Sequence, residues 1–400
     1  MPHQNLALVG CLCILIGMFV SRAMMSIGMM LLISNAIMHN QLLVNVKSYL
    51  KQPLWVGLGF YFILFSISIL WSANTSYAIE RMQIMLPFLV LPFAFHSVPI
   101  TNRKLLDGIV AAFLILLCSG ISWSLLQYFG NKAAFDEGYG VAHVIPTPFK
   151  NDHIRFSLAV VLGICFAFDF LLRYQQKWVR ISTLFFIVYA VVYLHILSAK
   201  TGILLFYILA FCFLLFLVSK QQYRKWALSS LIGLVLLPII MYAVSTSFRN
   251  KLSYVKYSIS QMQNRELQPE VSDEGRLISY RYALDAIKQK PLFGIGLGDV
   301  ADEMKLYYSL DFPGRNVIVL LPHNQFLMAG MAMGMIGILY LLILQIVLCR
   351  QLLQNGFLGF AFWLMMFFTL MIEPLYETQY GTCMFIFFLL LILQRRNVEV

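Results

Sequence analysis

Residues 201–218 read TGILLFYILAFCFLLFLV, an unbroken run of 18 residues without a charged side chain. The hydrocarbon core of a bilayer is about 30 Å thick, and a helix needs roughly 20 apolar residues to cross it. This stretch therefore predicts a transmembrane helix. Similar stretches recur along almost the whole chain and predict about twelve membrane spans, at residues 6–20, 24–39, 54–72, 82–98, 105–129, 154–172, 179–197, 201–218, 226–246, 324–349, 355–372 and 379–394.

The composition of the chain also indicates a membrane protein. Of its 400 residues, 60% are hydrophobic and 12% are charged, a balance that excludes an ordinary soluble globular domain. Irregular backbone cannot face lipid, so we expect an all-α fold, a polytopic transmembrane helical bundle. We expect N-terminal transmembrane helices in residues 1–246, a long loop containing short helices in 247–322, and C-terminal transmembrane helices in 323–400.

The N-terminal stretch Met1–Val20 is apolar, as a signal peptide would be. It has no basic segment at its start and no small-residue cleavage site. We therefore expect it to be retained as the first transmembrane helix.

The distribution of basic residues predicts the orientation of the bundle. With the N-terminus inside the cell, one set of turns receives thirteen basic residues and the opposite short loops receive six. Because cytoplasmic loops carry an excess of Lys and Arg, both termini are expected in the cytoplasm and the long loop in the periplasm of a bacterial inner membrane. The net charge of +11 then has a topological cause, and no nucleic-acid partner is expected. The thirteen are Lys47, Lys51, Arg103, Lys104, Arg173, Lys177, Arg180, Lys220, Arg224, Lys225, Arg350, Arg395 and Arg396, and the six are Arg22, Arg81, Lys132, Lys150, Arg155 and Lys200.

All seven cysteines fall inside predicted spans, where they are expected to pack rather than to form disulfides or bind metal. We therefore expect no thiolate metal site. The cysteines are Cys11, Cys13, Cys118, Cys165, Cys212, Cys349 and Cys383.

Polar residues concentrate in the loop from about Ser247 to Pro322, which holds ten basic and nine acidic residues. Within it, the sequence from Ser272 predicts a helix that Ser272 or Asp273 would cap and that ends at Lys290-Pro291. An apolar stripe at helical spacing is expected to lie on the membrane face of the bundle. The stripe consists of Leu277, Tyr280, Leu284 and Ile287.

Two further motifs follow this helix. Gly294-Ile-Gly-Leu-Gly298 superficially resembles a nucleotide-binding loop, but no strand precedes it, so we interpret it as a tight connection that passes close to a neighbouring helix. His323 then stands at the start of an apolar helix. A helix N-terminus favours a neutral imidazole and attracts anions, although a histidine at such a boundary is often only an interfacial or capping residue.

Three motifs in this region resemble those of the O-antigen ligase and O-antigen polymerase superfamily of membrane glycosyltransferases. They are Gly275-Arg276 with an aromatic residue four positions later, KPLFGIGLG at 290–298, and PHNQFL at 322–327 before a glycine-spaced helix. The resemblance covers about 75 residues, and the topology extends it more loosely. It implies a ligase that moves a glycan from undecaprenyl diphosphate to lipid A-core at the periplasmic face, without a metal or a cofactor.

The resemblance also implies roles for individual residues. His323 matches the proposed general base, with Asn324 beside it as a substrate-binding candidate, and Arg276 matches the arginine proposed to hold the diphosphate. Lys200 stands where the family has a further arginine, so the charge is kept but the planar fork that binds phosphate is lost.

The chemistry of glycan transfer supports these assignments independently. Displacing a diphosphate with a sugar hydroxyl requires a base for the proton and cations for the departing anion. Arg155 is a weaker candidate for that anion, because an arginine at the end of a span often only reaches towards lipid headgroups. His153 and His143 are left out of the predicted site.

Two alternatives remain open at the level of sequence. A polymerase or a protein oligosaccharyltransferase of the same superfamily would use the same donor and differ only in its acceptor. A polysaccharide transporter is the alternative from another class. Transporters usually place charged residues near the middle of the membrane, whereas this chain keeps nearly all its charges at span ends or in the loop.

Overall fold

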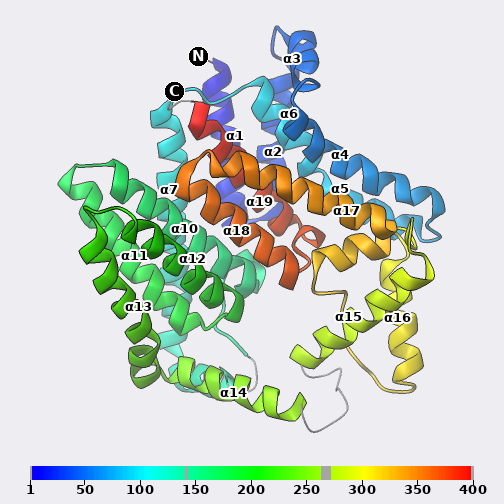
Figure 1. Ribbon diagram of the computed structural model, residues 1–400. Helices are drawn as coiled ribbons and strands as arrows, with labels where there is room; N and C mark the ends of the chain where they lie inside the picture. Colours follow the sequence, from blue (N-terminus) through cyan, green and yellow to red (C-terminus); the bar gives the residue numbers. More distant parts are fainter. Residues whose placement is uncertain (1, 140–142, 263–271, 398–400) are drawn as a thin grey trace.

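The computed structural model describes residues 2–139, 143–262 and 272–397, shown in Figure 1. Within these ranges every regular element is a helix and no strand is present. The predicted all-α fold is therefore confirmed.

Nine helical segments of the described chain are long and apolar enough to cross a membrane. Each predicted span coincides with one of these segments, with a tenth candidate that is bent by 107°, or with one of two shorter apolar helices. The nine are α1 (Pro2–Val20), α4 with η1 (Pro53–Ile67, Ser68–Trp71), α5 with α6 (Thr75–Met85, Pro87–Ser97), α7 (Arg103–Gly130), α10 (His153–Arg173), α11 (Lys177–Leu197), α12 (Lys200–Val218), α13 (Arg224–Val244) and α17 (Gln325–Leu353). The bent pair is α2 (Arg22–Ile37) with α3 (Leu42–Tyr49), and the shorter two are α18 (Gly356–Ile372) and α19 (Gln379–Asn397).

The remaining helices are shorter or more polar. The long loop contributes three of them, which lie together at one end of the bundle (Figure 1). They are α14 (Thr246–Met262), α15 (Ser272–Gln289) and α16 (Val300–Asp311), and the others are α8 (Lys132–Gly138), α9 (Pro148–Asn151) and η3 (Leu375–Glu377).

The centre of the bundle is α19. From Cys383 to Ile392 each of its side chains is at most 1% exposed. A helix that is apolar on all sides is stable only when other apolar groups surround it, and here protein does so. By contrast, α13 buries only Ala227 and Met241 and leaves its apolar surface for lipid.

Both chain ends lie at the same end of the bundle (Figure 1). The side chain of Gln4 donates a hydrogen bond to the carbonyl of Pro99 at 3.2 Å, and that of Gln394 donates to the carbonyl of Phe95 at 2.8 Å. We call this end the terminus side, and the opposite end, which carries α14 and α15, the loop side.

A buried group of charges, here called the terminal cluster, holds α19 on the terminus side. Arg395 Nη2 lies 2.7 Å from Asp107 Oδ1 on α7 and 3.0 Å from Asp169 Oδ2 on α10. Tyr174 also donates a hydrogen bond to Asp107, at 2.6 Å. The Arg395 side chain is only 2% exposed, so its charge is compensated almost entirely by these two carboxylates.

α17 is broken at Gly334, whose φ of 61° and ψ of −150° are not helical. Three backbone hydrogen bonds of 2.7, 2.7 and 3.2 Å join residues 291–296 to residues 331–335 across the break. A Cβ on Gly294 or Gly334 would lie 2.4 Å from a backbone oxygen of the opposite segment. The glycine motif is therefore the predicted tight connection. It satisfies backbone groups that the broken helix cannot satisfy itself.

The predicted apolar stripe of α15 is not the face that packs against protein, and its place at the membrane stays a prediction. Leu277 and Leu284 are 44% and 47% exposed, whereas the buried side chains lie one to two positions away and face α16 and α17. The predicted end of this helix is confirmed, but Ser272 and Asp273 lie in its first turn rather than before it. The buried apolar residues are Ile278, Tyr282, Ala283 and Ala286.

Candidate active site

The candidate site lies on the loop side, where α15, α17 and α18 meet around Glu373. This residue follows the last turn of α18 in an extended conformation, with φ −145° and ψ 143°. Its carboxylate is 5% exposed. A carboxylate buried to this degree needs polar or charged partners.

Glu373 has two cationic or titratable partners, and both were predicted site residues. Its Oε1 lies 2.8 Å from Arg276 Nη2, and its Oε2 lies 3.2 Å from His323 Nδ1. The side chains of Arg276 and His323 are 25% and 22% exposed, so both can still meet a ligand. The structure thus brings the predicted diphosphate-binding arginine and the predicted base together on one carboxylate.

Sequence reasoning missed Glu373 itself. The residue is the first acid after Asp311, and it stands alone at the end of an apolar span. Since acids in or beside membrane spans are often functional, this isolation was a signal that could have identified it.

Two neighbouring side chains fix the position of His323. Tyr280 Oη donates a hydrogen bond to the His323 carbonyl at 2.7 Å. The Asn324 side-chain oxygen accepts from the backbone N–H groups of Phe326 and Leu327, at 2.8 and 3.1 Å, and so caps α17. Its amide nitrogen donates to the Met371 carbonyl at 2.9 Å. Both ends of the Asn324 side chain are engaged within the protein, so the structure gives it a positioning role, and the substrate contact stays a prediction.

A second cation of the predicted site pairs with α15 one helical turn before Arg276. Lys200, the first residue of α12, forms an ion pair of 2.5 Å with Asp273 Oδ2. Asp273 and Arg276 are three residues apart on α15 and therefore share one face. Lys200 is thus held beside Arg276 by contact with the same helix.

Lys251 on α14 is a further cation that sequence reasoning did not select. Burial and the charges of Lys200 and Arg276 lower the pKa of Lys251 to about 8, against the opposing effect of Asp273. Its ammonium and that of Lys200 both approach the ring of Tyr254, at 5.1 and 5.7 Å from the centroid. Three cations from three different helices therefore gather in one region, where an anion would be stabilised.

The two residues considered on α10, Arg155 and His153, lie in surroundings that differ from those predicted. Arg155, a predicted anion ligand, is 9% exposed and forms an ion pair with Asp152, and its Nε is buried without a hydrogen-bond partner among the described residues. His153, which the prediction left out, interacts electrostatically with Arg276 and Glu373. The histidine is therefore more closely coupled to the site than the arginine.

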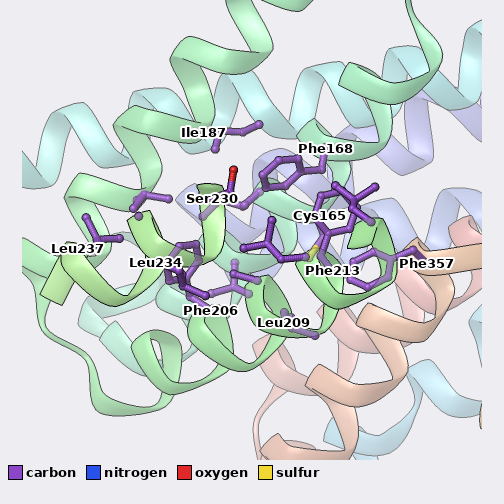
Figure 2. A pocket seen from close by; sticks show the side chains of 17 residues that line it. Cys165, Phe168, Ile187, Phe206, Leu209, Phe213, Ser230, Leu234, Leu237 and Phe357 are labelled. Atoms are coloured by element: carbon purple, nitrogen blue, oxygen red, sulfur yellow. The ribbon is translucent and has the colours of Figure 1, made fainter. Parts of the chain in front are cut away.

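An apolar cavity of about 330 Å³ lies along α12, between α10, α11 and α13 (Figure 2). Its lining is aromatic and aliphatic except for Ser230, and it includes Phe206, Phe213 and Leu234. Phe206 is six residues from Lys200 on the same helix, about 9 Å along its axis. The cavity therefore begins close beneath the cations of the site.

No three His, Cys, Asp or Glu side chains come together in the described chain as a group that could hold a metal ion.

Comparison with known proteins agrees with the motifs. The family model described as O-antigen ligase matches residues 185–342, a range that contains Lys200, Lys251, Arg276 and His323. A search of curated proteins finds no match. A member of this family is, in general terms, a glycosyltransferase-like membrane enzyme. Over residues 185–342 the chain is therefore similar to the O-antigen ligase family, in agreement with the resemblance that its motifs carry.

Proposed function

We propose that this protein transfers a glycan from undecaprenyl diphosphate to a hydroxyl group of lipid A-core. The observation that carries the proposal is the Glu373 bridge, which joins Arg276 at 2.8 Å to His323 at 3.2 Å. A cation for the leaving group and a base for the nucleophile are the two groups that this displacement requires.

His323 is the base in this proposal. With Nδ1–H donating to Glu373, Nε2 carries the free lone pair and accepts the proton of the acceptor hydroxyl. The hydroxyl oxygen forms a bond to the anomeric carbon as the bond from that carbon to the diphosphate oxygen breaks, and the electron pair leaves with the diphosphate. Glu373 compensates the positive charge that the imidazole gains.

Arg276, Lys200 and Lys251 hold the diphosphate in this proposal. Arg276 can offer a planar fork to two phosphate oxygens, whereas each lysine acts as a point charge. The ion pairs to Glu373 and Asp273 orient Arg276 and Lys200. Arg155 has the weaker claim, because Asp152 already pairs with it.

The apolar cavity of Figure 2 has room for the part of the donor's lipid tail that lies next to the diphosphate. A polyprenyl chain is apolar along its length, and the cavity is lined almost entirely by hydrocarbon. Since the cavity begins about two turns of α12 below Lys200, one donor can place its diphosphate among the cations and its tail between the helices.

The proposed site faces the periplasm of the inner membrane. The thirteen-to-six bias of basic residues supports a cytoplasmic terminus side and a periplasmic loop side. Undecaprenyl diphosphate glycans and lipid A-core meet only on that face, as the family resemblance implies.

Reconstitution of the purified protein tests the proposed reaction. Proteoliposomes containing the full chain, undecaprenyl-diphosphate-linked glycan and lipid A-core should form glycan-bearing lipid A-core. A deletion strain should lose long-chain lipopolysaccharide while it keeps lipid-linked polymer. Loss of polymer length with single units still joined to the core would instead identify a polymerase and overturn the ligase reaction.

A further inference from the structure

A second cavity on the loop side is separate from the site around His323. It encloses about 710 Å³ between α2, the α5–α6 segment and the turn from Glu377 to Gln379. Its polar lining includes Arg22, Ser26, Arg81 and Glu377. Nothing in the reaction described above uses these groups.

Two of the lining side chains are buried with part of their hydrogen-bonding capacity unused. Glu377 is 6% exposed, and its Oε2 has no hydrogen-bond partner among the described residues. The nearest cationic atom is Arg81 Nη1, at 3.9 Å, which is too far for a hydrogen bond. Arg81 Nε is also buried without a hydrogen bond. Unsatisfied buried polar atoms at the wall of a cavity indicate a polar ligand.

The balance of charge around this cavity differs from that of the diphosphate site. Arg22 and Arg81 face Glu80 and Glu377, so the formal charges cancel. Ser26 and Gln379, whose side chains share a hydrogen bond of 2.9 Å, add neutral donors and acceptors. Such a lining suits a ligand rich in hydroxyl groups, which both donates and accepts, more than a polyanion.

The cavity also has an apolar half. Met29, Met30 and Ile33 continue its wall along α2 beyond Ser26, over about 10 Å of helix. Met30 is 63% exposed, so this part of the wall borders the surroundings of the bundle. A ligand that fills both halves has a polar head and a hydrocarbon body.

The two sites share their structural supports. Glu373 faces the first site, and Glu377, four residues later, faces the second, so the two Cα atoms are at most about 14 Å apart. On α17, Gln325 donates a hydrogen bond to Glu377 Oε1 at 3.3 Å and follows His323 by two residues. A saccharide held in the second cavity therefore lies close enough to His323 for a short oligosaccharide to span the distance between them.

We propose that this cavity binds the acceptor, with the saccharide headgroup among Arg22, Ser26, Arg81 and Glu377 and an acyl chain along Met29, Met30 and Ile33. The inference rests on the proposed function. It adds that donor and acceptor occupy opposite sides of the turn between Glu373 and Glu377, so the two lipids reach the base without sharing a binding site.

A binding experiment with two lipids tests this inference. The full chain is placed in nanodiscs as the His323→Gln variant, which prevents turnover, and titrated with lipid A-core or with undecaprenyl diphosphate. Adding Ser26→Trp, which fills the cavity, or Arg22→Ala, which removes an exposed side chain, should weaken lipid A-core binding by about tenfold. Binding of undecaprenyl diphosphate should stay unchanged.

Ala23→Trp is the matched control, because Ala23 is exposed on the same helix and does not line the cavity. It should bind both lipids as the parent does. The inference is overturned if Ser26→Trp and Arg22→Ala both keep lipid A-core binding, if they weaken both lipids equally, or if the parent does not bind lipid A-core. Intact binding of both lipids without transfer by the wild-type chain would overturn the proposed reaction and leave the acceptor cavity standing.

Discussion

The two charge clusters at opposite ends of the bundle differ in which charge they bury. In the terminal cluster the central arginine, 2% exposed, lies between two carboxylates that are 9% and 12% exposed and that also pair with Arg103 and Arg173 at the rim. On the loop side one carboxylate, 5% exposed, lies between an arginine and a histidine that are 25% and 22% exposed. The first cluster encloses its cation, whereas the second buries its anion and leaves the cationic groups accessible.

The difference in exposure distinguishes a structural cluster from a reactive one. A fully enclosed ion pair can fix how helices pack, but it cannot meet a substrate. A cluster with a buried orienting group and exposed partners can hold the partners in place and still present them to a ligand. Both clusters would look alike in a list of ion pairs.

The largest effect is expected from His323→Gln. Glutamine keeps a hydrogen-bonding side chain but cannot take up a proton, and loss of a general base typically costs about 10² to 10⁴ in rate. The variant should insert normally, bind undecaprenyl diphosphate and transfer almost no glycan in proteoliposomes. Transfer close to the wild-type rate would return His323 to the role of a boundary residue.

Arg395→Met should give the opposite phenotype. It removes the central cation from Asp107 and Asp169, which keep Arg103 and Arg173 as partners, so the cost should lie below the about 3–5 kcal/mol of a buried ion pair that is broken outright. We expect a marked fall in thermal stability in detergent, with kcat per folded molecule preserved. Arg350→Met, at an exposed position near the end of α17, is the control. A loss of kcat without a loss of stability would contradict the contrast between the clusters.

Glu373→Gln should lower kcat by about 10- to 100-fold, the usual cost of removing a group that orients a reactive side chain. Glutamine keeps the shape but cannot compensate the charge that His323 gains. The variant should retain its melting temperature, which separates it from Arg395→Met. Asp285→Asn, on the same side of the bundle in an ion pair with Lys288, should leave kcat unchanged. Full activity of Glu373→Gln would remove the carboxylate from the mechanism.

Lys251 should make donor binding dependent on pH. Because its pKa is lowered to about 8, the ammonium is present below that pH and is lost above it. The affinity for undecaprenyl diphosphate should therefore fall a few-fold between about pH 7 and about pH 9, a range in which an ordinary lysine stays charged. Lys251→Arg should abolish this fall. An identical pH profile in Lys251→Arg would exclude Lys251 from the anion site.

The smallest effect is expected from Gly233→Leu. Gly233 lines the apolar cavity, and no atom lies within 4 Å of the position its Cβ would take, so leucine occupies free space without strain. We expect the KM for a full-length polyprenyl donor to rise a few-fold, while that for a short-chain analogue stays the same. Gly108→Leu, also into open space but near the start of α7, is the control. If the substitution changed the KM equally for both donors, the lipid tail of the donor would lie outside this cavity.

Hydropathy located the membrane helices well because it depends on local composition. The opening stretch at 201–218, for example, is α12 from Lys200 to Val218. Local periodicity did not identify the face of α15 that packs against α16 and α17, because tertiary partners set that face and no local pattern records them.

The candidate site was predictable only in part for a related reason. Arg276, Lys200 and His323 were found from motifs and from the chemistry of the reaction. Glu373 was missed because it pairs with residues 97 and 50 positions away. Lys251 was missed because its lowered pKa arises from burial and from the charges of Lys200 on α12 and Arg276 on α15, which only the folded chain brings to it. Asn324 was assigned to the substrate from its place beside His323, although an asparagine directly before an apolar helix also matches the N-cap that the structure shows.

The break at Gly334 has a consequence for the rigidity of the candidate site. Ile295 and Gly296 donate hydrogen bonds to the carbonyls of Met331 and Ala332 before the break, and Met335 after the break donates to the carbonyl of Pro291. The segment that follows α15 is therefore fastened to α17 on both sides of the glycine. Because α15 carries Arg276 and His323 stands just before α17, these bonds brace the proposed anion ligand and the proposed base against one another.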